Sequence, residues 1–265
     1  MVSTSGKQGG AQRTSPADVV ESDVPDDSVS LAAARRYRNL AGVERAIVGC
    51  DRCDRLRRHC HAVAMNPPAR YRGETYWARP VPGYGDPRAR LLVVGLAPAA
   101  NGGNRTGRVF TGDSSGNWLY ETLHHFGFAN QPFSTGRNDG LVLTGVYVTA
   151  GARCAPPQNR PTPAEFARCR EYLAAETRLL SEVRVVVTLG SLGHEQWLRA
   201  SGWWPKLSPR ERPKFGHGAE TRLADGTWLL CSYHPSQQNT NTGKLTRPMF
   251  YGVFERARAL VDAER

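Results

Sequence analysis

The segment from Gly95 to Asp113 combines five glycines with polar side chains that could do chemistry. Glycine lets the backbone approach a ligand closely and readily adopts positive φ values. Asp113 and Asn101 are the polar groups best suited to act there. Two phosphate-binding motifs fail: Arg108-Val109 replaces the Lys-Ser/Thr of a Walker A loop, and the first glycines lack the G-x-G spacing of dinucleotide loops. We therefore predict a ligand pocket that holds a carboxylate, with a plain tight turn as the alternative.

The six cysteines form a second group of residues with possible chemistry. Four of them fall into two pairs, namely Cys50 with Cys53 and Cys154 with Cys169. Four thiolates can hold one zinc ion or one [4Fe–4S] cluster, although this spacing matches no common short zinc finger. Buried free cysteines are the alternative. Cys60, between two histidines, is a rival ligand, whereas Cys231 lies within a predicted strand and is assigned to the core.

The apolar pattern places these residues in an α/β fold. Residues 91–94 have the composition of a buried parallel strand, and Pro98 ends that strand. Further strands are expected within 140–149, 183–189 and 227–233, and helices at 31–49 (one helix or a broken pair), 114–126, 163–180, 191–200 and 246–263. Thr162, Pro163 and Glu165 predict the start of one helix. The alternation predicts a mostly parallel sheet with helices on both faces, which binds ligands where its strands end.

Length and charge narrow the class of protein. A chain of 265 residues fits one α/β domain with extensions, and residues 1–30 have the composition of a disordered tail. No apolar run could span a bilayer or serve as a signal peptide, so a cytoplasmic protein is expected. The net charge is +11, and the tail itself is acidic. This excess favours a polyanionic partner, with a solvated basic surface as the alternative.

Together the motifs resemble one family, the type 5 (B-type) iron–sulfur uracil-DNA glycosylases of the uracil-DNA glycosylase superfamily. The resemblance covers about residues 45–261. It rests on Gly95-Leu96-Ala97-Pro98-Ala99 with residues 101–113, on His234-Pro235-Ser236, on the two cysteine pairs, on residues 76–87 and on Cys154-Ala155-Pro156-Pro157. It implies a single domain over 31–265, in three α/β/α layers with a four-stranded parallel sheet. It also implies a structural [4Fe–4S] cluster on Cys50, Cys53, Cys154 and Cys169.

The resemblance implies a base-excision repair enzyme. Such an enzyme hydrolyses the N-glycosidic bond of uracil and other deaminated or modified bases in double-stranded DNA, and leaves an abasic site. Hypoxanthine and ethenocytosine are further candidate substrates. The damaged base must leave the stack and enter a pocket. A monomer without membrane attachment, cytoplasmic and associated with the nucleoid, is the expected state.

Residue roles follow from the resemblance and from the charge that builds up during cleavage. Asp113 would stabilise the sugar cation and position water, His234 would donate to the base oxygen, and Phe110 would stack on the base. A helix cap, a core histidine and a loop anchor are the respective alternatives. The further residues expected to bind the substrate are Gly95, Leu96, Ala97 and Asn101. Those expected to contact DNA are Asn104, Arg105, Ser236, Gln237, Asn239 and Asn241.

Two departures from the family pattern bear on specificity. Leu96 and Ala97 are apolar where uracil-strict relatives carry an acidic residue or Asn, and Ala150 stands where those relatives carry an Asn that reads uracil. A missing polar reader loosens discrimination, because specificity depends on polar groups that a wrong base leaves unpaired. The alternatives to a glycosylase are a non-catalytic, zinc-stapled nucleic-acid-binding module and a hydrolase of free nucleosides.

Overall fold

A computed structural model describes Met1 and residues 26–263, so most of the predicted tail lies outside the described residues. The last residues of the predicted tail are helical, because α1 (Asp27–Ala34) begins before residue 30. The predicted tail boundary at residue 30 was therefore wrong. The carboxylate of Asp27 is buried and pairs with Arg170 and Arg199. Both arginines lie far along the chain, so the local composition could not reveal this helix.

A six-stranded sheet forms the centre of the molecule, in the order β1-β3-β2-β4-β6-β5. The strands are β1 (Tyr84–Gly85), β2 (Leu91–Gly95), β3 (Val146–Ala150), β4 (Val185–Leu189), β5 (Glu220–Arg222) and β6 (Trp228–Ser232). The four inner strands are parallel, as predicted. The four-strand count was wrong because β1 and β5 add short antiparallel edges. These edge strands are too short and too exposed to leave an apolar pattern.

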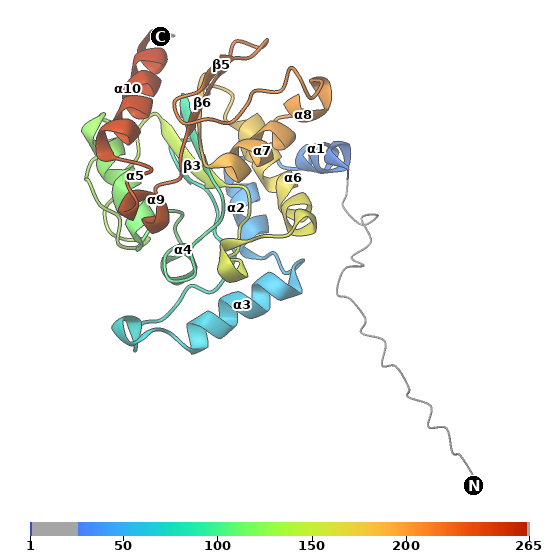
Figure 1. Ribbon diagram of the computed structural model, residues 1–265, viewed down its shortest axis with the longest axis vertical. Coiled ribbons are helices and arrows are strands. Elements are labelled where there is room, and N and C mark those ends of the chain that lie inside the picture. Colours follow the sequence, from blue (N-terminus) through green and yellow to red (C-terminus); the bar gives the residue numbers. More distant parts are fainter. Residues whose placement is uncertain (2–25, 264–265) are drawn as a thin grey trace.

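Helices cover both faces of the sheet (Figure 1). Besides α1, the described helices are α2 (Leu40–Val48), α3 (Asp54–Met65), α4 (Gly103–Thr106), α5 (Ser114–His125), α6 (Pro163–Leu179), α7 (Ser191–Ala200), α8 (Trp203–Lys206), α9 (Gln237–Asn241) and α10 (Arg247–Ala263), with 3-10 turns at Ala69–Tyr71 and Pro157–Asn159. In the described part of the chain, no helix has the length and apolarity needed to cross a membrane. The α/β/α prediction is confirmed, whereas α3, α4, α8 and α9 were not anticipated.

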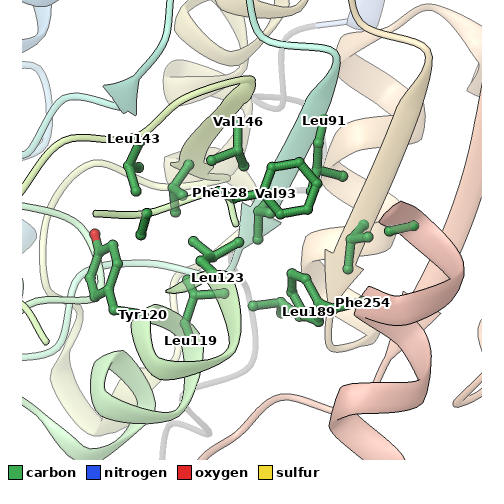
Figure 2. Packing of buried hydrophobic residues seen from close by; sticks show 14 of the residues in the cluster. Leu91, Val93, Leu119, Tyr120, Leu123, Phe128, Leu143, Val146, Leu189 and Phe254 are labelled. Atoms are coloured by element: carbon green, nitrogen blue, oxygen red, sulfur yellow. The ribbon is translucent and has the colours of Figure 1, made fainter. Parts of the chain in front are cut away.

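Two apolar layers hold the helices against the sheet. Helices α5 and α10 pack on one face, and α2, α6 and α7 pack on the other. Figure 2 shows the first layer, with side chains from the strands and helices interleaved around Phe128 and Leu123. The inner strands β2, β3 and β4 are buried along their whole length, and β6 is buried from Leu229 onward, which explains their largely apolar sequences.

Local signals predicted the helix boundaries best. Thr162 caps α6, and the reciprocal bond from the Thr162 backbone N–H to the Glu165 carboxylate measures 2.7 Å. This confirms the capping box, a feature that contributes about 1 kcal/mol to helix stability. The predicted helix at 31–49 is a broken pair, α1 and α2. The strand expected within 140–149 starts only at Val146, because Gly145 before it has a positive φ of 69°.

Candidate active site

The predicted active-site segments meet at one edge of the sheet. The parallel strands β2 and β6 both end there, so the loop after Gly95 and the segment after Ser232 lie at the same edge. Figure 1 places α4 and α9, which belong to these two segments, together at that end of the molecule. This is the edge at which α/β sheets bind their ligands.

Asp113 lies at the end of the glycine-rich loop and caps α5. Its carboxylate accepts a hydrogen bond of 2.9 Å from the Gly116 backbone N–H. The loop backbone passes so close that a Cβ on Gly102 would lie 2.1 Å from Asp113 Oδ2. Burial raises the pKa of Asp113, while the backbone N–H groups and Arg105 oppose that shift. The helix cap, which was the predicted alternative, is therefore present, and the capping carboxylate is half-buried.

Phe110 and His234 lie side by side although more than a hundred residues separate them. Their rings stack with centroids 5.8 Å apart and an angle of 27° between planes. The Phe110 ring covers Gly95, where an added Cβ would lie 2.5 Å from Cζ. Phe110 also has a positive φ of 50°, a conformation that costs free energy in a bulky residue and often marks functional loops. Burial lowers the pKa of His234 to about 4, so its imidazole is neutral near pH 7.

The start of the loop forms the wall next to the cysteines. Leu96 and Ala97 pack against Ala152, Phe166 and Cys169. The backbone also continues the pairing with the chain after β3, through a 2.9 Å bond from the Ala152 N–H to the Leu96 carbonyl. The predicted substrate-binding residues at 95–97 thus lie between Phe110 and the cysteine region.

Asn101 is fixed by a residue that the motif analysis did not single out. The hydroxyl of Tyr76, which is buried, donates a hydrogen bond of 2.8 Å to Asn101 Oδ1. Two backbone bonds, from Trp77 to the Arg105 carbonyl and from Ala78 to the Asn104 carbonyl, hold the aromatic segment against α4. The aromatic, proline-rich composition of residues 76–87 was the available signal for this contact.

Two residues predicted to contact DNA make their hydrogen bonds inside the protein instead. Asn104 is fully buried, and its Nδ2 donates to the carbonyls of Cys60 and Ala100 at 3.2 and 3.4 Å. Arg105 is mostly buried and bonds to Glu74 and to loop carbonyls. The polar character of both residues serves the loop, so the DNA-contact prediction does not fit them.

The residues shortly after His234 form the short helix α9. Ser236 caps α9 by accepting a bond from the Asn239 N–H at 3.4 Å. Asn239 Nδ2 donates to the His234 carbonyl at 2.8 Å, so this side chain positions the histidine. Gln237 and Asn241 are exposed, and their side chains are available to a partner at this edge.

The four paired cysteines lie close to guanidinium groups. Arg52 Nε lies 3.4 Å from Cys50 Sγ, and Arg57 Nη1 lies 4.0 Å from Cys154 Sγ. Burial raises the pKa of the Cys53 and Cys169 thiols, and the nearby Arg168 and Arg153 oppose that shift. Cationic neighbours of this kind stabilise thiolates, which are the form that binds iron or zinc. The donor set therefore fits an anionic thiolate cluster.

No ready-made site for a single metal ion is formed in the described part of the chain. Over residues 26–263, no three Cys, His, Asp or Glu side chains converge on one point that could hold a metal ion. A [4Fe–4S] cluster would be held by four thiolates, which is one of the two possibilities that the cysteine pairs predict. Cys60 is fully buried, lies against Cys154, and donates to the Ala155 carbonyl at 3.6 Å. Cys231 lies in β6 beside His194, at 3.3 Å, remote from this group.

A cavity of about 290 Å³ lies between α2 and the segment around β1. Its lining includes Glu44, Tyr84 and Arg137, but neither Asp113 nor His234. Gly107 and Arg108 reach this cavity from the back of the glycine-rich loop. This cavity is therefore distinct from the site around Asp113 and His234.

These features define the class of protein. The model of the uracil DNA glycosylase superfamily matches residues 82–258, and the chain belongs to that superfamily. Within it, the chain is similar to type-5 uracil-DNA glycosylases, which confirms the resemblance seen in the motifs. It is 49% identical over 214 residues to the type-5 enzyme of Thermus thermophilus, which covers 81% of this chain and 94% of the relative.

Two further relatives place the chain within the superfamily. It is 47% identical over 216 residues to the type-5 uracil-DNA glycosylase of Mycobacterium tuberculosis, with 81% of this chain and 79% of the relative covered. A type-4 uracil-DNA glycosylase of Archaeoglobus fulgidus is 30% identical over 155 residues, with 57% of this chain and 60% of the relative covered. The similarity to the type-5 branch is thus higher in identity and longer in extent than this type-4 match.

Proposed function

We propose that the chain is a base-excision repair glycosylase that hydrolyses the N-glycosidic bond of uracil in double-stranded DNA. One combination of observations carries the proposal: Phe110, in the loop that ends at Asp113, stacks on His234 at the carboxyl ends of the parallel strands, in a chain 49% and 47% identical to two type-5 uracil-DNA glycosylases. A non-catalytic, zinc-stapled nucleic-acid-binding module would not need the strained backbone of Phe110 or the half-buried carboxylate of Asp113. The enzyme acts as a monofunctional hydrolase and leaves an abasic site.

The roles follow from the electrostatics of the site. As the glycosidic bond breaks, the sugar becomes cationic and the base anionic. The Asp113 carboxylate stabilises the sugar and orients the attacking water, and Asn101 binds the substrate beside it. His234 is neutral, so it donates an N–H to the departing base without carrying a proton's charge. Phe110 stacks on the flipped base, a contact that every base can make.

We propose a broad range of substrates for the same site. The side chain at the end of β3 is that of Ala150, which is buried and offers no hydrogen bond to a base edge. Leu96 and Ala97 are apolar as well. A pocket without a polar reader accepts uracil, hypoxanthine or ethenocytosine with modest discrimination, because no buried polar group is left unpaired by any of them.

The cofactor of the proposal is a structural [4Fe–4S] cluster. Cys50, Cys53, Cys154 and Cys169 would hold it, and its bound form links the chain around α3 to the loop after β3 and to α6. Iron in such a site contributes to folding, because the ligands come together only in the folded chain. Cys154→Ser should therefore lose iron and lower the melting temperature, whereas Cys60→Ser should retain the wild-type iron content, measured by visible absorption and metal analysis. Iron loss in Cys60→Ser would reassign the ligand set.

DNA binding in the proposal depends on the basic surface and on α9. The exposed Gln237 and Asn241 contact the duplex beside the flipped base, and Ser236 sets the start of their helix. The net charge of +11 supplies attraction to phosphates. A monomer acting on cytoplasmic, nucleoid DNA is the corresponding state of the protein.

The function is tested with a labelled duplex that contains one uracil. Incubation with the purified protein, followed by alkali, should cut the labelled strand at the uracil, and without alkali the strand should stay intact. Strand cleavage without alkali would contradict the monofunctional assignment. Binding without any cleavage would favour a non-catalytic module, and release of uracil from free deoxyuridine would favour a nucleoside hydrolase.

A further inference from the structure

Arg105 makes contacts to both ends of the loop that carries the reactive groups. Its Nε donates to the Asn101 carbonyl at 2.9 Å, and its Nη2 donates to the Gly112 carbonyl at 3.1 Å. These two carbonyls directly precede Gly102 and Asp113, the pair in which the backbone approaches the carboxylate. One planar guanidinium thus fixes the separation between the two ends of the loop.

The remaining surface of the guanidinium is held from outside the loop. Nη1 donates to Glu74 Oε2 at 2.6 Å, and the group lies over the Tyr71 ring, 4.1 Å from its centroid. The Arg105 side chain is 13% exposed, against 43% for Glu74. Three of its five N–H donors and one face are therefore used inside the protein, and a phosphate would meet the Glu74 carboxylate first.

We propose, on the basis of the proposed function, that Arg105 is a positioning residue that holds Asn101 and Asp113 in register for cleavage and does not bind a DNA phosphate. The planar fork is required because it reaches two carbonyls and a carboxylate in fixed directions. A lysine carries the same charge but makes point contacts, so it cannot replace the arginine here. A displacement of about 1 Å at such a site can slow a reaction about 100-fold.

The test compares Arg105→Lys and Arg105→Gln with the wild-type enzyme. Single-turnover cleavage of a uracil duplex should slow about 10- to 100-fold in both variants. Affinity for a duplex with a tetrahydrofuran abasic site, which cannot be cleaved, should stay within about 2-fold of wild type, with the same dependence on salt. A lost phosphate contact would instead weaken binding and lower the salt slope by about 1 in Arg105→Gln.

The pH profile gives a readout that a purely structural role would not move. Arg105 is a cation near Asp113, so its replacement by Gln should shift the acid limb of the single-turnover rate to higher pH. Lys at this position should shift it less, because the charge remains. Equal profiles in wild type and Arg105→Gln, together with equal rates, would overturn the proposal.

Arg258→Gln is the matched control. Arg258 also pairs with one carboxylate, Asp262 at 2.8 Å, and lies over one ring, that of Phe128, but it does so on α10 away from α4. Its cleavage rate should equal that of wild type. If Arg105→Gln fails to fold, Glu74→Gln and Tyr71→Leu release the guanidinium without removing it, and each should slow cleavage several-fold at unchanged DNA affinity.

The outcomes distinguish a failure of the proposed function from a failure of the positioning role of Arg105. Wild-type protein that fails to cleave the uracil duplex would contradict the proposed function itself. Wild-type protein that cleaves it, with Arg105→Lys and Glu74→Gln at the same rate, would contradict only the positioning role.

Discussion

The two segments that follow β2 and β6 carry one reactive group each, but they are held in different ways. The loop before Asp113 is fixed by distant residues, through Tyr76 on Asn101 and Glu74 on Arg105. The segment after His234 is fixed mainly by its own helix α9, through Asn239 on the His234 carbonyl. The backbone of the loop before Asp113 therefore depends on tertiary contacts, and the backbone at His234 on a local one.

Burial acts on both groups and shifts their pKa values in opposite directions. It raises the pKa of Asp113 and lowers that of His234 to about 4, because it disfavours the charged form of each. Backbone N–H groups and Arg105 oppose the shift at Asp113, whereas burial is the cause of the shift at His234. Burial thus disfavours the charge on both side chains, one acidic and one basic.

Among these substitutions, Asp113→Asn should have the largest effect on the cleavage rate. Asn still caps α5, but it cannot stabilise the sugar cation, so cleavage of every base should slow about 10²–10⁴-fold. A carboxyl group with a raised pKa destabilises the fold when ionised, so the melting temperature at pH 7 should equal or exceed that of wild type. Single-turnover rates on uracil and hypoxanthine duplexes and thermal unfolding measure both effects. Wild-type rates would reduce Asp113 to a helix cap.

His234→Ala tests the other half of the comparison. Loss of one donor to developing negative charge should slow uracil cleavage about 10²–10³-fold. The loss should differ for hypoxanthine, because its acceptor lies elsewhere on the base. The ratio of the two rates, measured with the same enzyme preparation, is the informative quantity. Equal losses on both bases would place His234 on the sugar side with Asp113.

Gly102→Ala and Asn239→Ala compare the two supports directly. The new Cβ would displace the Asp113 carboxylate, so Gly102→Ala should slow cleavage about 10- to 100-fold, while Asn239→Ala should slow it only several-fold. Gly136→Ala is the control, since a Cβ there meets no atom within 4 Å. Single-turnover rates at saturating enzyme make the comparison, and the reverse order would refute it.

The smallest expected effect is on stability against pH. The folded-state pKa of His234, about 4, lies below the 6.5 of an unperturbed histidine, so the unfolded chain binds this proton first on acidification. The stability associated with neutral His234 is thus complete above pH 6.5 and is lost as the pH falls toward 4. Thermal unfolding of wild type and His234→Gln at several pH values should show a shallower decline in the variant, and parallel declines would contradict the shift.

The sequence by itself determined the inner sheet, the long helices and the residues that could react. Apolar runs, a capping box and glycine spacing act over a few neighbours, so the pattern along the chain suffices to locate β2, β4, α6 and Asp113. The same local logic hid β1 and β5, whose few residues acquire strand form only by pairing with β3 and β6.

Only the tertiary structure decided which polar residues face a ligand. Asn104 and Arg105 are residue types that often contact DNA. Both instead bind partners inside the protein that lie more than twenty residues away along the chain: the Cys60 carbonyl for Asn104, and Glu74 and Tyr71 for Arg105. A side chain's partners are set by which surfaces the fold brings within about 3 Å, and that depends on the packing of whole elements. The sequence identifies the groups that could react, and the fold decides which polar side chains are exposed and which hold other segments in place.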